Sequence, residues 1–441
     1  MTSSTRSARA VLGAAFDAAV RAADPARVLV DAWPDPPRGQ VLVLGMGKAA
    51  VKMAAAAEAH YRAVGVRVRG AVSAPHGSVE RSDTAPTTIE VLAAGHPVPD
   101  AGSEVAGRRL LQLAAHAVAD DLVLVLVSGG GSALATVPDG VTREQLAGLS
   151  RELLASGADI REMNVVRRRL DAIKGGRLAA AAHPAQVAAL IVSDVVGDDP
   201  LDIASGPTVG DPGEARAALD VLDRYGVAAP AARDALRAEA EGRRDGPPRP
   251  DDPRLARCRT TIVASGSTGL AAAREVFEAA GVPTRLLSAE VVGDAREAGR
   301  RHAREAASVL EHGRLLDGSS CRPPVVLLSG GETTVHVRGE GRGGRNSTFA
   351  LALALALPSG APVHALAADS DGIDGVGGHA GAFVDPGLFE RIPREEARAL
   401  DASDDSYAAF ERAGGLFTTG PTGTNVNDLR FVWVHAWNET R

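Results

Sequence analysis

A run of three glycines between two serines is the first part of this 441-residue sequence that suggests chemistry. In SGGGSAL (128–134), Gly129, Gly130 and Gly131 follow an apolar run, and glycine lets successive backbone N–H groups point into one concavity. Ser128 and Ser132 add hydroxyl donors. The string therefore predicts a cradle for a carboxylate or phosphate; the alternative is a tight strand-to-helix turn.

A second glycine-rich turn, in VLVLGMGKAAVKMA, ends at Lys48. The turn fits the G-x-G-x-x-A pattern of dinucleotide sites, but the acidic ribose ligand expected at the end of the next strand is missing. The spacing also excludes a Walker A loop. Only three of the 48 basic residues are lysine, which favours a need for an ammonium over chance survival. We expect Gly47 and Lys48 to form an anion site at a helix N-terminus; the alternative is a purely structural turn.

Basic residues gather in DIREMNVVRRRLDAIKGGRLA. A helix over 161–173 would place Asn164 and Asp171 on one face, and Arg167 and Lys174 on another. Lys174 would stand at the helix end, before two glycines. Cations near a helix C-terminus often only complement the helix dipole, so this segment predicts either an anion site or a solvated helix end.

Carboxylates follow several apolar runs. Asp194 ends one run, Glu332 follows another, and Asp369 and Asp371 open the string DSDGIDG. In α/β proteins the carboxyl end of a strand is where an active-site acid, base or magnesium ligand belongs. DSDGIDG lacks the order of an EF-hand loop, and clusters of Asp and Gly are also common in solvent-exposed loops.

The C-terminal half contains further polar strings. We expect TTVHVRG (333–339) to close a β-hairpin whose glycine-rich tip leads into an apolar helix. The candidate anion site at this helix N-terminus comprises Gly343, Gly344, Arg345 and Asn346; the alternative is a flexible tip with incidental arginines. Thr424 and Asn425, in TTGPTGTNVNDL, are suited to phosphate or ribose contacts, although a plain loop is nearly as consistent with this string.

The elements that must position these residues are apolar strands alternating with helical stretches. Strands are predicted at 41–45, 66–74, 122–129, 187–194, 260–266, 284–290, 324–330, 333–339, 362–369 and 429–437. Continuous apolar strands separated by helices indicate parallel α/β sheets. The Pro- and charge-rich segment 238–257 is the best candidate linker. We therefore expect two α/β domains, 1–237 and 258–441.

Composition excludes several classes of protein. A formal net charge of −7 and an aromatic content of 3% disfavour a nucleic-acid-binding protein. The two cysteines, Cys258 and Cys321, form no disulfide framework or zinc motif. No apolar run reaches the roughly 18 residues of a membrane helix. We expect a cytoplasmic protein with no membrane partner, in which residues 9–23 form an amphipathic helix rather than a signal peptide.

Taken together, nine strings resemble the class II glycerate kinases, the glycerate 2-kinase (MOFRL) family. Each string alone is common, but nine in family order, from about residue 40 to 430, are highly specific. The strings are LGMGKAA, GHPVPDAGS, SGGGSAL, NVVRRRLDAIKGGRLA, SDVVGDDPLDIASGPT, LSGGETTV, GRGGRNS, DSDGIDG and GPTGTNVNDL.

The resemblance implies a Rossmann-like N-terminal domain with a parallel sheet and flanking helices, a smaller C-terminal α/β domain, and an active-site cleft between them. It also implies transfer of a phosphoryl group from ATP, with Mg²⁺, to the 2-hydroxyl of D-glycerate, giving 2-phosphoglycerate and ADP. Lys48 and Arg345 are the charges that the resemblance marks as important. Such a transfer needs positioning and positive charge, which these two residues would supply.

Residue chemistry suggests the other roles. Asp194 would orient or deprotonate the 2-hydroxyl, and the glycines of SGGGSAL would hold a carboxylate or phosphate. Lys174 or Arg167 would bind the glycerate carboxylate. Glu332, together with Asp369 or Asp371, would hold Mg²⁺.

Two other functions stay open at this point. Relatives in this family have often been named hydroxypyruvate reductase, so the first alternative is an NAD(P)H-dependent reductase, which the missing ribose acid disfavours. The second is a non-catalytic module that binds sugar phosphates. The sequence leaves open whether the protein is a homodimer, and it does not separate glycerate from close 2-hydroxy acids.

Overall fold

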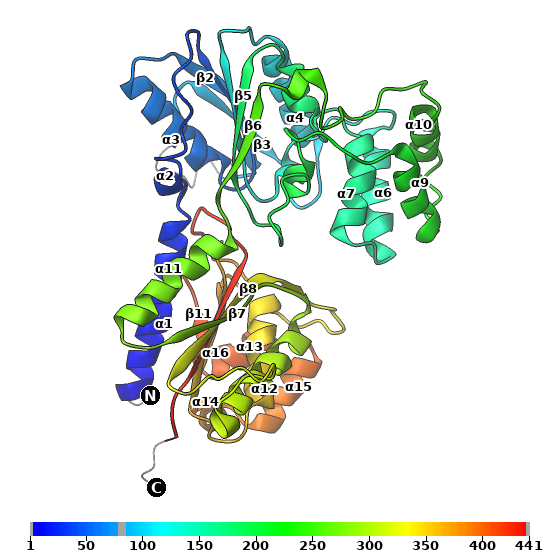
Figure 1. Ribbon diagram of the computed structural model, residues 1–441. Coiled ribbons are helices and arrows are strands. Elements are labelled where there is room, and N and C mark those ends of the chain that lie inside the picture. Colours follow the sequence, from blue (N-terminus) through cyan, green and yellow to red (C-terminus); the bar gives the residue numbers. More distant parts are fainter. Residues whose placement is uncertain (1–2, 78–84, 438–441) are drawn as a thin grey trace. The chain divides into compact units, whose positions relative to one another are not determined.

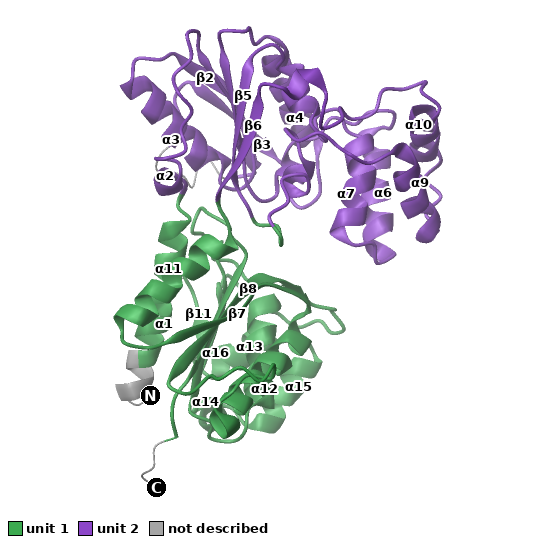
Figure 2. Ribbon diagram, viewed as in Figure 1, with its two compact units in different colours: residues 1–24, 194–197, 264–441 green, residues 25–193, 198–263 purple. Residues whose placement is uncertain are grey.

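The computed structural model describes residues 3–77 and 85–437, which form two compact units (Figures 1 and 2). Unit 1 comprises Met1–Asp24, Asp194–Gly197 and Ala264–Arg441. Unit 2 comprises Pro25–Ser193 and Asp198–Val263.

The two units divide the chain differently from the predicted ranges 1–237 and 258–441. The first 24 residues belong to unit 1 because their helix packs on the sheet of that unit. The predicted linker 238–257 belongs to unit 2, where the carbonyl of Pro248 accepts the N–H of Asp211 at 2.9 Å. The proline and charged residues of segment 238–257 therefore belong to an irregular stretch that packs against unit 2, and not to a linker between domains.

Unit 2 is built on a six-stranded sheet. In spatial order its strands are β3 (Ile89–Ala94), β2 (Val68–Pro75), β1 (Val41–Met46), β4 (Leu122–Val127), β5 (Gln186–Val192) and β6 (Cys258–Ala264). Neighbouring strands from β3 to β5 run parallel, as predicted. Every residue of β1 and β4 is buried, which matches their continuous apolar sequences. The strand order reverses between β1 and β4, and open α/β sheets bind ligands at such a point.

Nine α-helices are described in unit 2. They are α2 (Pro25–Val28), α3 (Ala50–Ala63), α4 (Ala101–Ala115), α5 (Gly131–Leu134), α6 (Arg143–Ala155), α7 (Ile160–Arg169), α8 (Arg177–Ala181), α9 (Ala215–Arg224) and α10 (Pro230–Ala240). Two short 3-10 helices, Ile203–Ser205 and Pro253–Leu255, complete this unit. Helices α6, α7, α9 and α10 share an apolar core of their own and stand beside the sheet (Figure 1).

The helix predicted over 161–173 is shorter than expected. Helix α7 begins after the cap Asp159 and ends at Arg169. Asp171 instead forms a bridge with Pro138, so it does not share a helix face with Asn164. The Asp171 carboxylate accepts the N–H groups of Val137 and Ile173, which replace the hydrogen bonds of a continued helix.

The sheet of unit 1 is mixed rather than parallel. In spatial order its strands are β11 (Leu416–Phe417), β10 (Gly381–Val384), β9 (Val363–Asp369), β12 (Asp428–Val434), β8 (Val325–Thr334) and β7 (Thr284–Asp294). Strand β12 lies between β8 and β9 and is antiparallel to both, whereas β7 and β8 are parallel. The predicted hairpin is also wrong, because β8 continues to Thr334 and no strand occurs within 335–344.

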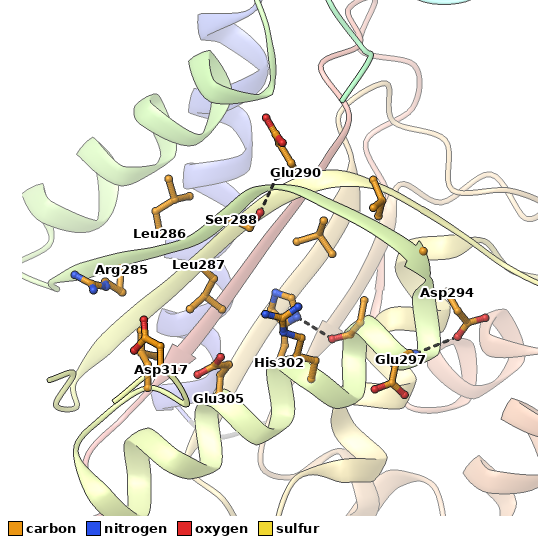
Figure 3. A pocket seen from close by; sticks show the side chains of 16 residues that line it. Arg285, Leu286, Leu287, Ser288, Glu290, Asp294, Glu297, His302, Glu305 and Asp317 are labelled. Atoms are coloured by element: carbon orange, nitrogen blue, oxygen red, sulfur yellow. Dashed lines mark hydrogen bonds between the residues drawn. The ribbon is translucent and has the colours of Figure 1, made fainter. Parts of the chain in front are cut away.

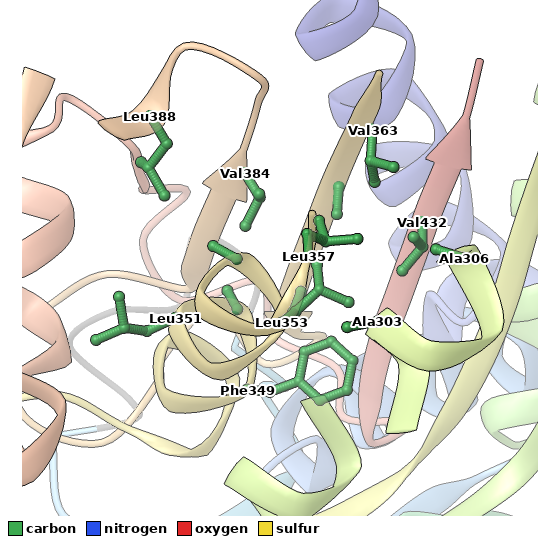
Figure 4. Close-up of a cluster of buried hydrophobic side chains, with 14 of the residues drawn as sticks. Ala303, Ala306, Phe349, Leu351, Leu353, Leu357, Val363, Val384, Leu388 and Val432 are labelled. Atoms are coloured by element: carbon green, nitrogen blue, oxygen red, sulfur yellow. The ribbon is translucent and has the colours of Figure 1, made fainter. Parts of the chain in front are cut away.

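Helices cover both faces of this sheet. They are α1 (Ser3–Ala22), α11 (Gly266–Ala279), α12 (Ala295–His312), α13 (Arg345–Ala356), α14 (Leu388–Arg391), α15 (Arg394–Ala402) and α16 (Ser406–Arg412). Because side chains alternate along a strand, Val326 of β8 packs with α1 and α11, and Leu327 packs with α12 and α13. Figure 4 shows the second layer around Phe349 and Val432. No helix within the described residues is long and apolar enough to cross a membrane.

Candidate functional site

The loops that follow β1 and β4 lie against each other. The N–H groups of Lys48 and Ala49 donate to the Gly129 carbonyl and to Ser128 Oγ, at 2.9 and 3.0 Å. Gly47 has a φ of 134°, and a Cβ there would lie 2.5 Å from the Ser128 carbonyl oxygen, so this approach requires glycine. The backbone donors predicted to bind an anion before α3 are therefore used within the protein. The half-buried side chain of Lys48 is left as the candidate cation.

A chain of hydrogen bonds links the SGGGSAL loop to α7. The Ser132 and Ser205 hydroxyls lie 2.9 Å apart, and Ser205 donates to Asn164 Oδ1 at 3.0 Å. Ala204 and Ser205 have φ values of 50° and 59°, a region that costs a non-glycine residue roughly 1–3 kcal/mol and that recurs at functional sites. Ser205 was not among the predicted site residues, although the string Ser-Gly-Pro after an acidic loop could have pointed to it.

A cavity of about 310 Å³ lies within unit 2. It brings together four residues predicted to bind ligands, namely Gly130, Ser132, Arg167 and Lys174. The other residues that line the cavity are His96, Pro97, Pro99, Ala133, Thr136, Arg143, Leu146, Ala147, Ser150, Leu154, Ile160, Met163 and Asp171. One end of the cavity is therefore cationic, and the wall from α6 and α7 is largely apolar.

Three cations line this cavity; Arg143 pairs with Glu144, and Arg167 and Lys174 differ in their pairing. Lys174 is 2% exposed, and its ammonium donates to Asp171 at 2.5 Å and to the Ala135 carbonyl at 3.1 Å. Burial lowers the pKa of Lys174, and Asp171 opposes that effect. Burial also lowers the pKa of Arg167, and Asp171 again opposes that effect, although the Arg167 side chain makes no hydrogen bond or close ion pair among the described residues. A half-buried guanidinium that no carboxylate contacts directly can receive a carboxylate or phosphate.

Arg345 is the centre of a second cluster, in unit 1. It is the first residue of α13, and its guanidinium contacts Asp428 at 2.7 Å, Asp369 at 2.7 Å and Glu332 at 3.1 Å. Burial alone would lower the pKa of Arg345, but these three carboxylates outweigh burial and raise it. Burial raises the pKa of Asp369, so this carboxylate needs a cation beside it to stay ionised. The predicted residues Glu332, Arg345 and Asp369 are thus brought together.

Asp428 and Arg430, which sequence reasoning missed, hold this cluster in place. Both side chains are 0% exposed and form an ion pair, and Arg430 also donates to Thr333 Oγ1 at 3.0 Å. Asp428 accepts a further hydrogen bond from Asn346 Nδ2 at 2.7 Å. The signal was present in NDLRFVWV, where two charges stand two residues apart at the start of an apolar strand. Such charges are buried only when they are paired.

The N-terminus of α13 is capped by Asp374. This buried carboxylate accepts the N–H groups of Asn346 and Ser347, at 2.9 and 2.8 Å, and the Ser347 hydroxyl at 2.7 Å. A Cβ on Gly344 would lie 2.3 Å from Asp374 Oδ1, so glycine is needed for this approach. The backbone donors at this helix N-terminus therefore bind Asp374, and the loop DSDGIDG positions Arg345.

Three other predicted residues of unit 1 bind neighbouring protein groups. Asn425 Nδ2 donates to Asp194 Oδ2 at 3.3 Å. Thr424 Oγ1 donates to the Ala23 carbonyl at 2.8 Å. Asp371 accepts the N–H of Ile373 at 2.9 Å, and its own N–H donates to Asp369 Oδ1 at 3.0 Å. Asn425 thus orients Asp194, while Thr424 ties its loop to the end of α1.

The chemistry of the Arg345 cluster fits a magnesium ion in part. Within the residues that the structure describes, no group of three or more His, Cys, Asp and Glu side chains has a metal-binding arrangement. Kinase-bound Mg²⁺, however, is usually held by one or two carboxylates plus substrate phosphates. The buried Asn346 Oδ1, next to Asp428, has no hydrogen-bond partner in the described part of the chain, and three carboxylates face the guanidinium groups of Arg345 and Arg430. Hard oxygen ligands and excess negative charge are therefore available.

A larger cavity, of about 660 Å³, lies between β7 and α12 (Figure 3). Its lining includes Glu290, Asp294 and Glu305 but none of the predicted site residues. Burial lowers the pKa of His302 to about 4, and His302 Nε2 lies 2.8 Å from Ser329 Oγ. His302 is thus neutral at neutral pH and belongs to the packing of α12 on the sheet.

Comparisons with known proteins place these features in a family. Residues 11–238 match the model described as "Domain of unknown function (DUF4147)", and residues 325–428 match the MOFRL family. The D-glycerate 2-kinase of Thermotoga maritima is 36% identical, over 93% of this chain and 94% of its own. The chain belongs to the glycerate 2-kinase (MOFRL) family.

The structural comparison agrees with this membership. The crystal structure of glycerate kinase from Thermotoga maritima superposes with a TM-score of 0.84 at 34% identity, over 97% of this chain and all of that one. The family also contains an Agrobacterium vitis protein with the provisional name hydroxypyruvate reductase, which is 42% identical over 98% of this chain and 96% of its own. Here β2 ends in Ser73, Ala74 and Pro75, so the acidic ribose ligand of a dinucleotide site is absent from that strand.

Proposed function

We propose that the protein is a D-glycerate 2-kinase, which transfers the terminal phosphoryl group of ATP to the 2-hydroxyl of D-glycerate and releases ADP. Membership of the glycerate kinase family supports this function. The observation that carries it is the half-buried side chain of Arg167, which makes no hydrogen bond or close ion pair among the described residues and shares a cavity with Lys174 and the SGGGSAL loop. Both substrates are anions, and this cavity is built for an anion.

We assign to Lys48 and Arg345 the positive charge that the transferred phosphoryl group needs. Phosphoryl transfer depends on positioning and electrostatic stabilisation more than on covalent chemistry. The loop contacts of Lys48 and the three carboxylates around Arg345 restrict where each cation can lie. Asp194, oriented by Asn425, accepts the proton of the attacking 2-hydroxyl.

The anion site of unit 2 binds a carboxylate or phosphate of the substrates. Gly130 and Ser132 present backbone and hydroxyl groups to the cavity, and Arg167 and Lys174 supply the charge. The chain of hydrogen bonds from Ser132 through Ser205 to Asn164 holds this wall in position. We propose that Gly343, Gly344 and Asn346 contribute indirectly, by fixing the start of α13 and hence Arg345.

ATP is the phosphoryl donor that the names of the related kinases imply, and we propose Mg²⁺ as its partner ion. Glu332 and Asp369, with the amide oxygen of Asn346, are the groups that would hold the ion. A bound Mg²⁺ would neutralise phosphate charge during transfer. We further propose a cytoplasmic location, since Cys258 and Cys321 are both free thiols.

A reductase acting on hydroxypyruvate is the second candidate, because a 42% identical relative carries that name. The two functions are separated by one assay of the purified protein. With ATP, Mg²⁺ and D-glycerate, we expect ADP release and a phosphorus NMR signal of 2-phosphoglycerate. Oxidation of NAD(P)H by hydroxypyruvate, seen as falling absorbance at 340 nm without ADP release under the first conditions, would refute the kinase.

A further inference from the structure

The cavity of unit 2 is longer than glycerate. Ile160, Met163 and Arg167 all line it and stand at i, i+3 and i+7 of α7, on one helix face. Seven residues at 1.5 Å rise span about 10 Å. Glycerate, from its carboxyl carbon to its 3-hydroxyl, spans three bonds of about 1.5 Å, hence roughly 4 Å. An acceptor bound at Arg167 would leave the far half of this groove empty.

The far half of the groove also has the wrong chemistry for glycerate. Its apolar wall consists of Leu146, Ala147 and Leu154 from α6 and Ile160 and Met163 from α7; Ser150 and Arg143, which pairs with Glu144, also line the cavity from α6. Leu154 is 68% and Ile160 55% exposed, so the rim of the groove presents aliphatic surface to solvent. Single exposed aliphatic side chains are common, but here they continue one apolar wall inside a cavity. Glycerate carries a polar group on every carbon and gains nothing from such a wall.

We infer that the apolar groove between α6 and α7 binds the purine base of the nucleotide, with its phosphates directed toward Arg167 and Lys174. This inference rests on the proposed kinase function, which requires a ligand that joins an aromatic base to a polyphosphate. A flat base is the part of that ligand that an aliphatic slot binds best. The distance of about 10 Å along α7 leaves room for the ribose between base and phosphates.

The anion at Arg167 has two sources, the nucleotide phosphates or the glycerate carboxylate. Asp171 acts on both cations, but only Lys174 donates a hydrogen bond to it, at 2.5 Å, so Arg167 offers the stronger attraction. A polyphosphate carries more charge than one carboxylate, and the apolar wall continues from this same cation. The D-glycerate carboxylate would then bind in the region around Lys48 and the SGGGSAL loop.

Isothermal titration calorimetry on the full chain tests the groove, with ADP, inorganic tripolyphosphate and D-glycerate as separate titrants. Ile160→Gln and Leu154→Gln remove apolar surface without adding charge at exposed positions. We expect each to weaken ADP binding about tenfold while tripolyphosphate binding changes by less than about twofold. Val118→Gln is the matched control, because Val118 is 58% exposed, lies in unit 2 and does not line the cavity.

A third variant identifies the anion. Arg167→Gln should weaken ADP and tripolyphosphate together and leave D-glycerate binding unchanged. Equal losses for ADP and tripolyphosphate in Ile160→Gln, or an unchanged ADP affinity, would overturn the inference. Weaker D-glycerate binding with unchanged ADP binding would assign the wall to the acceptor instead. If ADP binds as expected but no phosphoglycerate forms, the result would refute the kinase function and still support the nucleotide groove.

Discussion

The guanidinium Nε of Arg345 lies 2.7 Å from Asp428 Oδ1, and the same carboxylate forms an ion pair with the fully buried Arg430. One buried acid thus holds a candidate catalytic cation on one side and a structural cation on the other. Removing one partner of a buried ion pair costs more than the pair itself contributes, because an uncompensated charge stays in the interior.

Asp428→Asn keeps the shape of the side chain and removes its charge. Arg430, at 0% exposure, would then lose its ionic partner, so we expect the free energy of unfolding to fall by about 3–5 kcal/mol. Urea denaturation followed by circular dichroism measures this change. Glu332→Gln is the control, because Glu332 is 48% exposed and its ion pair should contribute less than about 1 kcal/mol. Equal losses in the two variants would contradict this account.

Asp374→Ala should separate a loss of positioning from a loss of folding. The substitution removes the cap of α13, which costs about 0.5–2 kcal/mol, and releases the helix turn that begins with Arg345. We expect kcat for phosphoglycerate formation to fall while the protein stays folded at 25 °C. Asp294→Ala removes the corresponding cap of α12, where Asp294 accepts the N–H groups of Arg296 and Glu297. That control should lose similar stability and keep its kcat.

Local features of the site were predictable because they depend on local physics. Gly47 and Gly130 follow buried strands, and the φ values of 134° and 80° found there favour glycine. The apolar runs of β1 and β4 predicted a parallel sheet, and the structure confirms it. The family resemblance pointed to Arg345, but only the structure shows that carboxylates surround its guanidinium.

Long-range features were not predictable from the same signals. Strand β12 is as apolar as a parallel strand, but it lies antiparallel between β8 and β9, a direction that depends on how a distant segment returns to the sheet. Asp428 is 83 residues from Arg345 in the chain, so no spacing rule connects them. The helix predicted through Asp171 ended early because the Asp171 carboxylate binds nearby backbone N–H groups.

Because His302 is buried, we expect the free energy of unfolding to decrease at acidic pH. Burial lowers the pKa of His302 to about 4, against about 6.5 in an unfolded chain, so the neutral form is favoured in the fold. This contribution is full above pH 6.5 and is lost as the pH falls toward 4, with a total on the order of 3 kcal/mol. His302→Gln should flatten the decline of unfolding free energy across this window. His312→Gln, at a side chain 62% exposed, should leave the decline unchanged.

Lys48→Ala tests the cation proposed for unit 2. If the ammonium acts on the transferred phosphoryl group, kcat/KM for D-glycerate should fall more than about tenfold, equivalent to about 1.4 kcal/mol of transition-state stabilisation. Lys48→Arg should also be poorly tolerated, because a planar guanidinium does not replace a compact ammonium. Lys52→Ala, in the first turn of α3, is the control and should change kcat/KM by less than about threefold. A loss below tenfold in Lys48→Ala would remove this residue from the mechanism.

Gly47→Ala should destabilise unit 2, because the new Cβ would lie 2.5 Å from the Ser128 carbonyl oxygen and the residue has a φ of 134°. Strain of this kind costs about 1–3 kcal/mol, and relief would require separating the loops after β1 and β4. Gly148→Ala is the opposite case, since Gly148 lies inside α6 and a methyl group added there would meet no atom within 4 Å. There alanine should raise the free energy of unfolding by about 0.5–1 kcal/mol. In thermal denaturation, a lower melting temperature for Gly47→Ala and a higher one for Gly148→Ala would verify that the close contact between the loops, and not the loss of a glycine as such, causes the destabilisation at Gly47.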